Sequence, residues 1–117
     1  PADAPWQALR EFSAGAQAGG APLWRVSLAG TAPLPSGAAP LLIDWGGALR
    51  WFAADGFDAF AYAGEYGGHA SLWWPPADWQ GETAQPLSPP LQALHQRLKL
   101  AFDPQRILNP GRLYSWL

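Results

Sequence analysis

The sequence predicts an α+β fold: a four-stranded antiparallel sheet with helices packed on one face, in a ferredoxin-like arrangement. Two observations lead to this prediction. Four short segments alternate apolar and polar residues with the period of a half-buried strand, and segments with the period of an amphipathic helix lie among them. A length of 117 residues suits one hydrophobic core, so we expect residues 1–117 to form a single domain.

The four predicted strands cover residues 23–29, 41–45, 48–52 and 69–74. Between the first two, residues 30–40 hold three prolines and two glycines. That composition predicts an ordered loop rather than a helix. The first crossover helix of the ferredoxin-like arrangement is therefore expected to be reduced.

The second and third strands flank Gly46 and Gly47, which indicates a hairpin. A two-residue loop would place Asp44 opposite Leu49 and mix polar with apolar residues on one face. We therefore predict a three-residue loop with a bulge, which pairs Asp44 with Arg50, because side chains that lie opposite each other share a face.

Three helices are predicted. The first begins at Asp3 and ends in the glycines that precede residue 21. The second is capped by Asp55 and ends at Gly67 and Gly68; Phe57, Phe60, Ala61 and Gly64 lie along one side of it. The third is capped by Ser88 and ends before Asp103, whose conformation is restricted by the following proline; its apolar stripe is Leu91, Leu94, Leu98, Ala101 and Phe102, with Leu100 on the far side.

Strand alternation gives the predicted sheet an apolar face, covered by helices, and a polar face. Leu49 and Trp51 are assigned to the apolar face together with Trp24 and Val26. The residues assigned to the polar face are Arg25, Ser27, Asp44, Arg50, His69 and Ser71. This face is either ordinary solvated sheet or a roof over a pocket that belongs to another domain.

Composition excludes several classes of function. Seven basic and nine acidic side chains give a net charge of −2, with no cationic cluster, so nucleic acid and anionic membranes are not expected partners. The sequence has no cysteine and two histidines, which argues against a metal site. No apolar run reaches the roughly 20 residues of a membrane span, so we expect a cytoplasmic protein. Because methionine is absent, we also expect this chain to be the C-terminal part of a longer protein.

Four sequence blocks carry a family resemblance. Residues 102–114, which include the Asn-Pro-Gly-Arg turn at positions 109–112, resemble the C-terminal signature of the FAD-linked oxidases of the vanillyl-alcohol oxidase type. Residues 23–28, 43–51 and 67–72 resemble further blocks of one branch, the FAD-binding subunits of bacterial glycolate oxidases. The blocks occur in order and together span residues 23–114.

The resemblance implies a cap domain that helps to enclose flavin and substrate, in an enzyme that oxidises glycolate or a similar 2-hydroxy acid. FAD would be bound mainly by an N-terminal domain absent from this chain, with Asn109, Gly111 and Arg112 near the flavin. Implied partners are this FAD-binding domain, a second flavin subunit and an iron–sulfur subunit, through which the protein would associate with a membrane. The domain alone is expected to be inactive.

The polar face supplies further candidate residues. A guanidinium can hold a carboxylate through two hydrogen bonds, so Arg25 and Arg50 are candidates for substrate binding. His69 is a candidate base toward the substrate hydroxyl, because its ordinary pKa lies near working pH; the alternative is a strand-end histidine bonded to backbone. Motifs that we associate with the metal-assisted catalytic subunit of such complexes are absent, which favours an FAD-binding or electron-transfer role.

Two alternatives belong to other classes. The first is a docking module that uses the polar face, Leu100, Trp116 and Leu117 to bind partner subunits, without a ligand. The second is a carbohydrate-binding module, because the chain has eight tryptophans. We assign four of these to the core, which argues against a sugar-stacking surface: Trp24, Trp45, Trp51 and Trp74.

Overall fold

A computed structural model of the chain describes Gln7 and residues 20–117, so the predicted first helix falls almost entirely outside the described residues. The chain divides into two compact units, Pro1–Trp79 and Gln80–Leu117. That residues 1–117 form one domain stays a prediction. The first holds the four strands and the second holds the long C-terminal helix.

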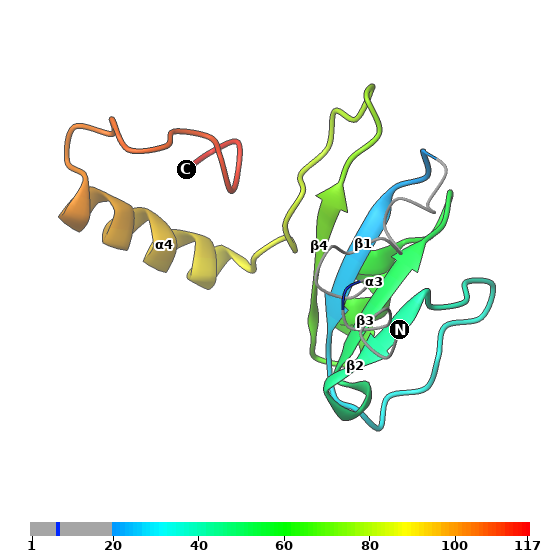
Figure 1. Ribbon diagram of the computed structural model, residues 1–117. Helices are drawn as coiled ribbons and strands as arrows, with labels where there is room; N and C mark the ends of the chain where they lie inside the picture. The colour runs from blue at the N-terminus through cyan, green and yellow to red at the C-terminus, as the bar shows by residue number, and fades with distance from the viewer. Residues whose placement is uncertain (1–6, 8–19) are drawn as a thin grey trace. The chain divides into compact units, whose positions relative to one another are not determined.

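The first unit is built on a four-stranded sheet in the order β2-β3-β1-β4, with every neighbouring pair antiparallel (Figure 1). The strands are β1 (Leu23–Ser27), β2 (Leu42–Asp44), β3 (Leu49–Ala53) and β4 (His69–Trp74). The predicted α+β class is confirmed. No helix or strand lies between β1 and β2, where a loop replaces the crossover helix of the ferredoxin-like motif.

Helix α3 (Ala59–Glu65) contacts β1 and β4 on one face of the sheet (Figure 1). Its N-cap is Asp58, whose Oδ1 accepts the N–H of Ala61 at 2.8 Å. The predicted cap at Asp55 is therefore wrong by three residues, because Gly56 has a left-handed φ of 72° that interrupts a helix. Of the side predicted for this helix, Phe57 and Phe60 are half-buried and pack against the core, whereas Ala61 and Gly64 are exposed. The buried residues of the helix are Ala59, Tyr62 and Ala63.

Each face of the sheet carries a buried apolar cluster. On the α3 face, Trp24 packs edge-on against Phe60 with ring centroids 5.0 Å apart. The buried residues of that cluster are Trp24, Val26, Leu28, Phe52, Ala59, Tyr62, Ala63, Ala70 and Leu72. On the opposite face, Leu23, Leu49 and Trp51 are buried. The opposite face is therefore partly apolar, not the polar surface that was predicted.

The register of the β2–β3 hairpin differs from the prediction. Asp44 pairs with Leu49, and Ile43 pairs with Arg50. The chain reverses through a 3-10 turn at Trp45–Gly47, where the Asp44 side chain accepts the N–H of Trp45 at 2.7 Å. Asp44 is thus satisfied by the turn itself, and its pairing with an apolar residue costs little at the edge of the sheet.

The assignment of β3 to the two faces is also wrong. Arg50 lies opposite Val26, and Phe52 lies opposite Trp24, so both point to the α3 face. Leu49 and Trp51 belong to the other face. Large apolar residues point to both faces of β3, so alternation alone does not assign its faces. The prediction therefore relied on the charge of Arg50, which suggested that this side chain points outward. The structure instead buries Arg50, with 3% of the residue exposed.

Two of the four tryptophans assigned to the core are exposed. Trp24 and Trp51 are buried as predicted, but Trp45 is 68% exposed in its turn. Trp74 is 45% exposed where the pairing of β4 with β1 shifts register at Leu23 and Trp24. Among the described residues, the exposed tryptophans lie in the hairpin turn (Trp45), at the end of β4 (Trp73 and Trp74) and in the loop after it (Trp79). The rings of Trp73 and Trp79 contact the buried rings of Trp51 and Trp24.

Gly68 lies where the turn after α3 comes close to the backbone of β1. A Cβ on this residue would lie 2.3 Å from the carbonyl oxygen of Ser27, whereas a Cβ on Gly67 would meet nothing within 4 Å. We expect Gly68→Ala to lower the free energy of unfolding by about 3 kcal/mol, because backbone has to shift. Gly67→Ala, which only strains a φ of 67°, should cost about 1 kcal/mol.

Urea unfolding of the full-length protein and both variants measures this difference. An equal or smaller loss for Gly68→Ala would contradict the close packing of residue 68 on β1.

The second unit contains helix α4 (Pro89–Phe102) and the segment that follows it. The helix ends at Phe102 as predicted, and its first turn holds Pro89 and Pro90. Ser88 occupies the N-cap position, but its side chain makes no capping hydrogen bond, contrary to expectation. The predicted apolar stripe is exposed, and none of the residues of α4 is buried. Neither of the described helices has the length and apolar character needed to cross a bilayer.

Candidate functional site

The segment after α4 is a shaped turn. Arg106, Asn109 and Gly111 have φ angles of 53°, 46° and 67°, all in the left-handed region. Two of these residues are not glycine, and a left-handed conformation costs such residues about 1–2 kcal/mol. The N–H of Arg112 donates to the carbonyl oxygen of Asn109 at 3.3 Å. The Asn-Pro-Gly-Arg sequence therefore forms a closed turn.

Asp103 holds the start of this segment. Its carboxylate is 4% exposed and accepts the N–H groups of Ile107 and Leu108 at 3.0 and 2.9 Å. Lys99 lies one helical turn earlier, with Nζ 2.8 Å from Oδ2 of Asp103. The hydrogen-bonded ammonium of Lys99 holds the pKa of Asp103 below its ordinary value. Sequence reasoning treated Asp103 only as the residue before a proline; the signal that it missed is the Lys-to-Asp spacing of four at the helix end.

The turn forms one wall of a cavity of about 440 Å³ within the second unit. The other wall comes from Gln80, Gly81, Glu82 and Thr83. Glu82 is already engaged, because its carboxylate accepts the N–H of Ser115 at 3.1 Å and also bonds the hydroxyl of that residue. Within the described part of the chain, Arg112 is then the one charged residue of the lining whose side chain makes no hydrogen bond or ion pair.

The tail is fixed by Tyr114. Its side chain is 6% exposed, and its hydroxyl donates to the carbonyl oxygen of Gln85 at 2.9 Å. The ring stacks on Trp116 with centroids 5.0 Å apart. Burial raises the pKa of Tyr114, so its hydroxyl remains a donor. This contact pins the residues directly after Arg112 and gives the cavity a fixed edge.

Arg25 and His69 share a face of the sheet in the first unit, as predicted. Arg25 pairs with Ser71 of β4, and His69 stands two residues earlier on that strand, opposite Ser27. Such a diagonal spacing separates positions by about 7–8 Å. His69 is exposed and Arg25 is half-buried. Neither makes a side-chain hydrogen bond or ion pair with other described residues.

Arg50 does not join them. It lies on the α3 face, where Nε donates to Gly47 O at 2.9 Å, Nη1 to Pro33 O at 3.0 Å and Nη2 to Ala32 O at 2.6 Å. Nη1 also bonds the hydroxyl of Tyr62, which donates to Pro33 O at 2.7 Å. The guanidinium is occupied by backbone, so we leave Arg50 out of the substrate site that was predicted.

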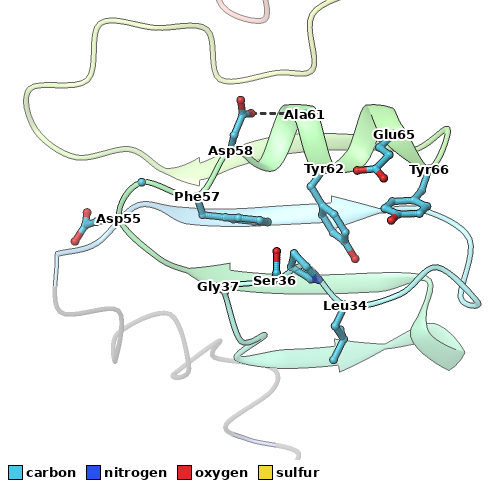
Figure 2. Close-up of a pocket in the computed structure, with 12 residues that line it drawn as sticks. Leu34, Ser36, Gly37, Asp55, Phe57, Asp58, Ala61, Tyr62, Glu65 and Tyr66 are labelled. Atoms are coloured by element: carbon cyan, nitrogen blue, oxygen red, sulfur yellow. Dashed lines mark hydrogen bonds between the residues drawn. The ribbon is translucent and has the colours of Figure 1, made fainter.

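A larger cavity of about 620 Å³ lies between α3 and the loop at residues 34–37 (Figure 2). Figure 2 shows Tyr62 pointing from α3 toward the loop that carries Leu34 and Ser36. Three carboxylates line the cavity, those of Asp55, Asp58 and Glu65, and its lining includes no basic side chain. A hydrogen bond to Glu65 raises the pKa of Tyr66 at its rim. This chemistry repels a carboxylate, so the cavity is unsuited to a 2-hydroxy acid.

No group of three or more side chains suited to metal binding occurs among residues 20–117 and Gln7. Two candidate ligand-binding features remain in the described part of the chain, one in each unit. They are the Arg25–His69 pair and the cavity at Arg112.

Comparison with known proteins shows two similarities. Residues 80–113 match the family model "FAD linked oxidases, C-terminal domain", so the match runs from one wall of the Arg112 cavity through α4 to the turn. This segment is similar to the C-terminal domain of FAD linked oxidases, which is the resemblance that the sequence predicted.

The whole chain is similar to one particular protein, glycolate oxidase subunit GlcE of Escherichia coli (strain K12). The two are 41% identical over 114 residues, which cover 96% of this chain and 31% of that subunit. The chain thus spans about a third of the length of this relative. No solved structure matches the chain significantly.

Proposed function

We propose that this chain is the C-terminal cap of an FAD-binding subunit in an enzyme that oxidises glycolate or a similar 2-hydroxy acid. The observation that carries the proposal is the similarity to GlcE along nearly all of the chain. The family match over residues 80–113 supports FAD as the cofactor. The cap helps to enclose flavin and substrate, and FAD is bound mainly by the part of the protein outside this chain.

The cofactor contact in this proposal is the turn formed by Asn109, Gly111 and Arg112. The residues fit an anionic or acceptor-rich group: an exposed guanidinium faces a cavity whose one carboxylate is taken up by Ser115. A guanidinium binds such groups through charge-assisted hydrogen bonds. The cavity volume of about 440 Å³ suits a portion of a cofactor.

The substrate contact is made by Arg25 and His69. Arg25 holds the substrate carboxylate, and His69 takes the proton of the hydroxyl group as the alcohol becomes a carbonyl. FAD, when bound, supplies the acceptor for the two electrons and the remaining hydrogen. The diagonal spacing of the two residues across β1 and β4 leaves room between them for a small acid.

The second candidate function is docking within a multi-subunit enzyme, and it is compatible with the first. Leu91, Leu94 and Leu98 are 45%, 40% and 49% exposed along α4. The occupant we propose for this stripe is the FAD-binding domain of the same subunit. A second flavin subunit and an iron–sulfur subunit complete the proposed cytoplasmic complex.

The cofactor contact is tested with Arg112→Ala in the full-length subunit. We expect the purified variant to lose most of its bound FAD, because the guanidinium contact is worth about 2 kcal/mol and its loss weakens binding about 30-fold. Flavin absorbance per mole of protein gives the occupancy, and circular dichroism checks the fold.

Arg97→Ala is the matched control, because Arg97 is an exposed arginine of α4 outside the cavity lining. A folded Arg112→Ala protein with full FAD content would remove the turn from the cofactor site.

A further inference from the structure

We propose that Asp103 is a positioning residue, which sets the orientation of the Asn-Pro-Gly-Arg turn through Ile107, Leu108 and Lys99. The inference rests on the proposed function, in which that turn contacts FAD. Nothing in the family match or the similarity to GlcE assigns a role to this carboxylate.

The two carboxylate oxygens of Asp103 bind different partners. Oδ1 accepts the N–H of Ile107 at 3.0 Å. Oδ2 accepts the N–H of Leu108 at 2.9 Å and lies 2.8 Å from Nζ of Lys99. These two amides belong to the residues immediately before Asn109. One buried side chain therefore fixes the backbone that leads into the turn.

Lys99 holds the next peptide group, the one between Leu108 and Asn109. Its Nζ bonds the carbonyl oxygen of Leu108 as well as the Asp103 carboxylate. The carbonyl of Leu108 and the N–H of Asn109 share one planar peptide group. Asp103 and Lys99 together hold Leu108 at both its N–H and its C=O, and this sets the plane from which Asn109 begins.

The backbone needs this support. Arg106 and Asn109 flank the two bonded amides, and both have left-handed φ angles, 53° and 46°. Conformations of this kind persist where the surroundings over-determine them. The direction of the chain at Asn109 then decides where Pro110 and Gly111 carry Arg112. Without the carboxylate, the segment is free to relax to ordinary φ values, and Arg112 leaves the cavity.

Asp103 acts through the turn, not on the flavin. It is 4% exposed, and both oxygens already have partners. Its position at the C-cap of α4 fixes the segment to a rigid element, since its own N–H donates to Lys99 O at 2.7 Å. Asp103 thus connects the turn to the C-terminal end of α4.

The test uses the full-length subunit with Asp103→Asn, Lys99→Gln and Lys99→Arg. Asparagine keeps the size of the side chain but can accept only one of the two N–H groups well, so we expect about tenfold weaker FAD binding. Lys99→Gln should weaken binding similarly, and Lys99→Arg, which retains the charge, should restore it. Asp78→Asn, at an exposed aspartate of the first unit, is the control. FAD dissociation constants come from flavin fluorescence.

A second readout needs no cofactor. In the FAD-free protein, hydrogen exchange of the segment 107–112 should speed up in Asp103→Asn and Lys99→Gln, while exchange in β1–β4 and the melting temperature stay close to wild type. A general loss of stability would accelerate exchange throughout and would overturn the positioning role.

The double variant Asp103→Asn/Arg112→Ala separates the two proposals. If Asp103 acts through the turn, the loss of FAD affinity in the double variant is smaller than the sum of the losses in the two single variants, because coupled residues are not additive. Fully additive losses, or unchanged affinity in Asp103→Asn, would overturn the positioning role and leave the cofactor contact standing. Unchanged affinity in Arg112→Ala would overturn the cofactor contact itself, and with it the role of Asp103.

Discussion

Replacing Arg50 with methionine should lower the free energy of unfolding by at least about 3 kcal/mol. The guanidinium donates to carbonyl oxygens of Gly47, Pro33 and Ala32, and it bonds the hydroxyl of Tyr62. Methionine fills a similar volume but donates no hydrogen bond, so the partly buried carbonyl oxygens of Gly47 and Ala32 lose this donor, and Pro33 O keeps only the Tyr62 hydroxyl. Each unpaired group costs about 1–3 kcal/mol.

The measurement is urea unfolding of the full-length protein. Arg50→Lys should recover little of the loss, because an ammonium cannot reproduce the planar fork that reaches the hairpin and the loop together. Arg25→Met serves as the control at a half-buried arginine without such partners. Equal stabilities for Arg50→Met and Arg25→Met would contradict the role of Arg50 as the link between the loop, the hairpin and α3.

Replacing Arg25 with glutamine should lower kcat/KM for the 2-hydroxy acid by about 100-fold in the assembled enzyme. Loss of a charge-assisted contact to a carboxylate is worth about 3 kcal/mol. We expect FAD content and melting temperature to stay unchanged, because Arg25 makes no side-chain bond within the described part of the chain. The effect should fall mainly on KM, since the carboxylate is held in the ground state as well as in the transition state.

Steady-state kinetics with glycolate give this value, with Arg97→Gln as the matched loss of an exposed positive charge. Unchanged kcat/KM in a folded, FAD-loaded Arg25→Gln enzyme would show that the β1–β4 face does not bind substrate.

Much of the fold could be predicted because β1 and β4 carry unambiguous patterns. Trp24 and Val26 alternate with Arg25 and Ser27, which places Arg25 and His69 on one face without any structural knowledge. Similarly, the Asp103-Pro104 pair predicts where α4 ends, because proline restricts the residue before it.

Strand β3 could not be assigned in the same way. Large apolar residues point to both faces of this strand. Its one charged residue, Arg50, is buried and donates hydrogen bonds to carbonyl oxygens of a loop some 17–20 positions away in sequence. No local pattern reveals that environment. The start of α3 was misplaced because a glycine after a capping residue does not by itself rule out a helix. Gly56 takes a left-handed φ, which the sequence does not reveal.

The two candidate sites differ in what sequence could reveal. The turn at residues 109–112 was found through its motif, and its shape follows from proline and glycine. Its support by Asp103 and Lys99 was missed, because a carboxylate beside a proline is read as a helix stop unless its hydrogen bonds are known. The acidic cavity of Figure 2 was missed as well, since it joins residues 34–37 to α3 across a long separation in sequence.

The most direct test of the proposed function is anaerobic reduction of the flavin in the full-length, FAD-loaded subunit assembled with its partners. We expect glycolate to bleach the flavin absorbance near 450 nm within the time of turnover, while acetate, which lacks the hydroxyl group, leaves it unchanged. If neither glycolate nor any other small 2-hydroxy acid reduces the bound flavin, the assignment of this chain to a 2-hydroxy-acid oxidase is wrong.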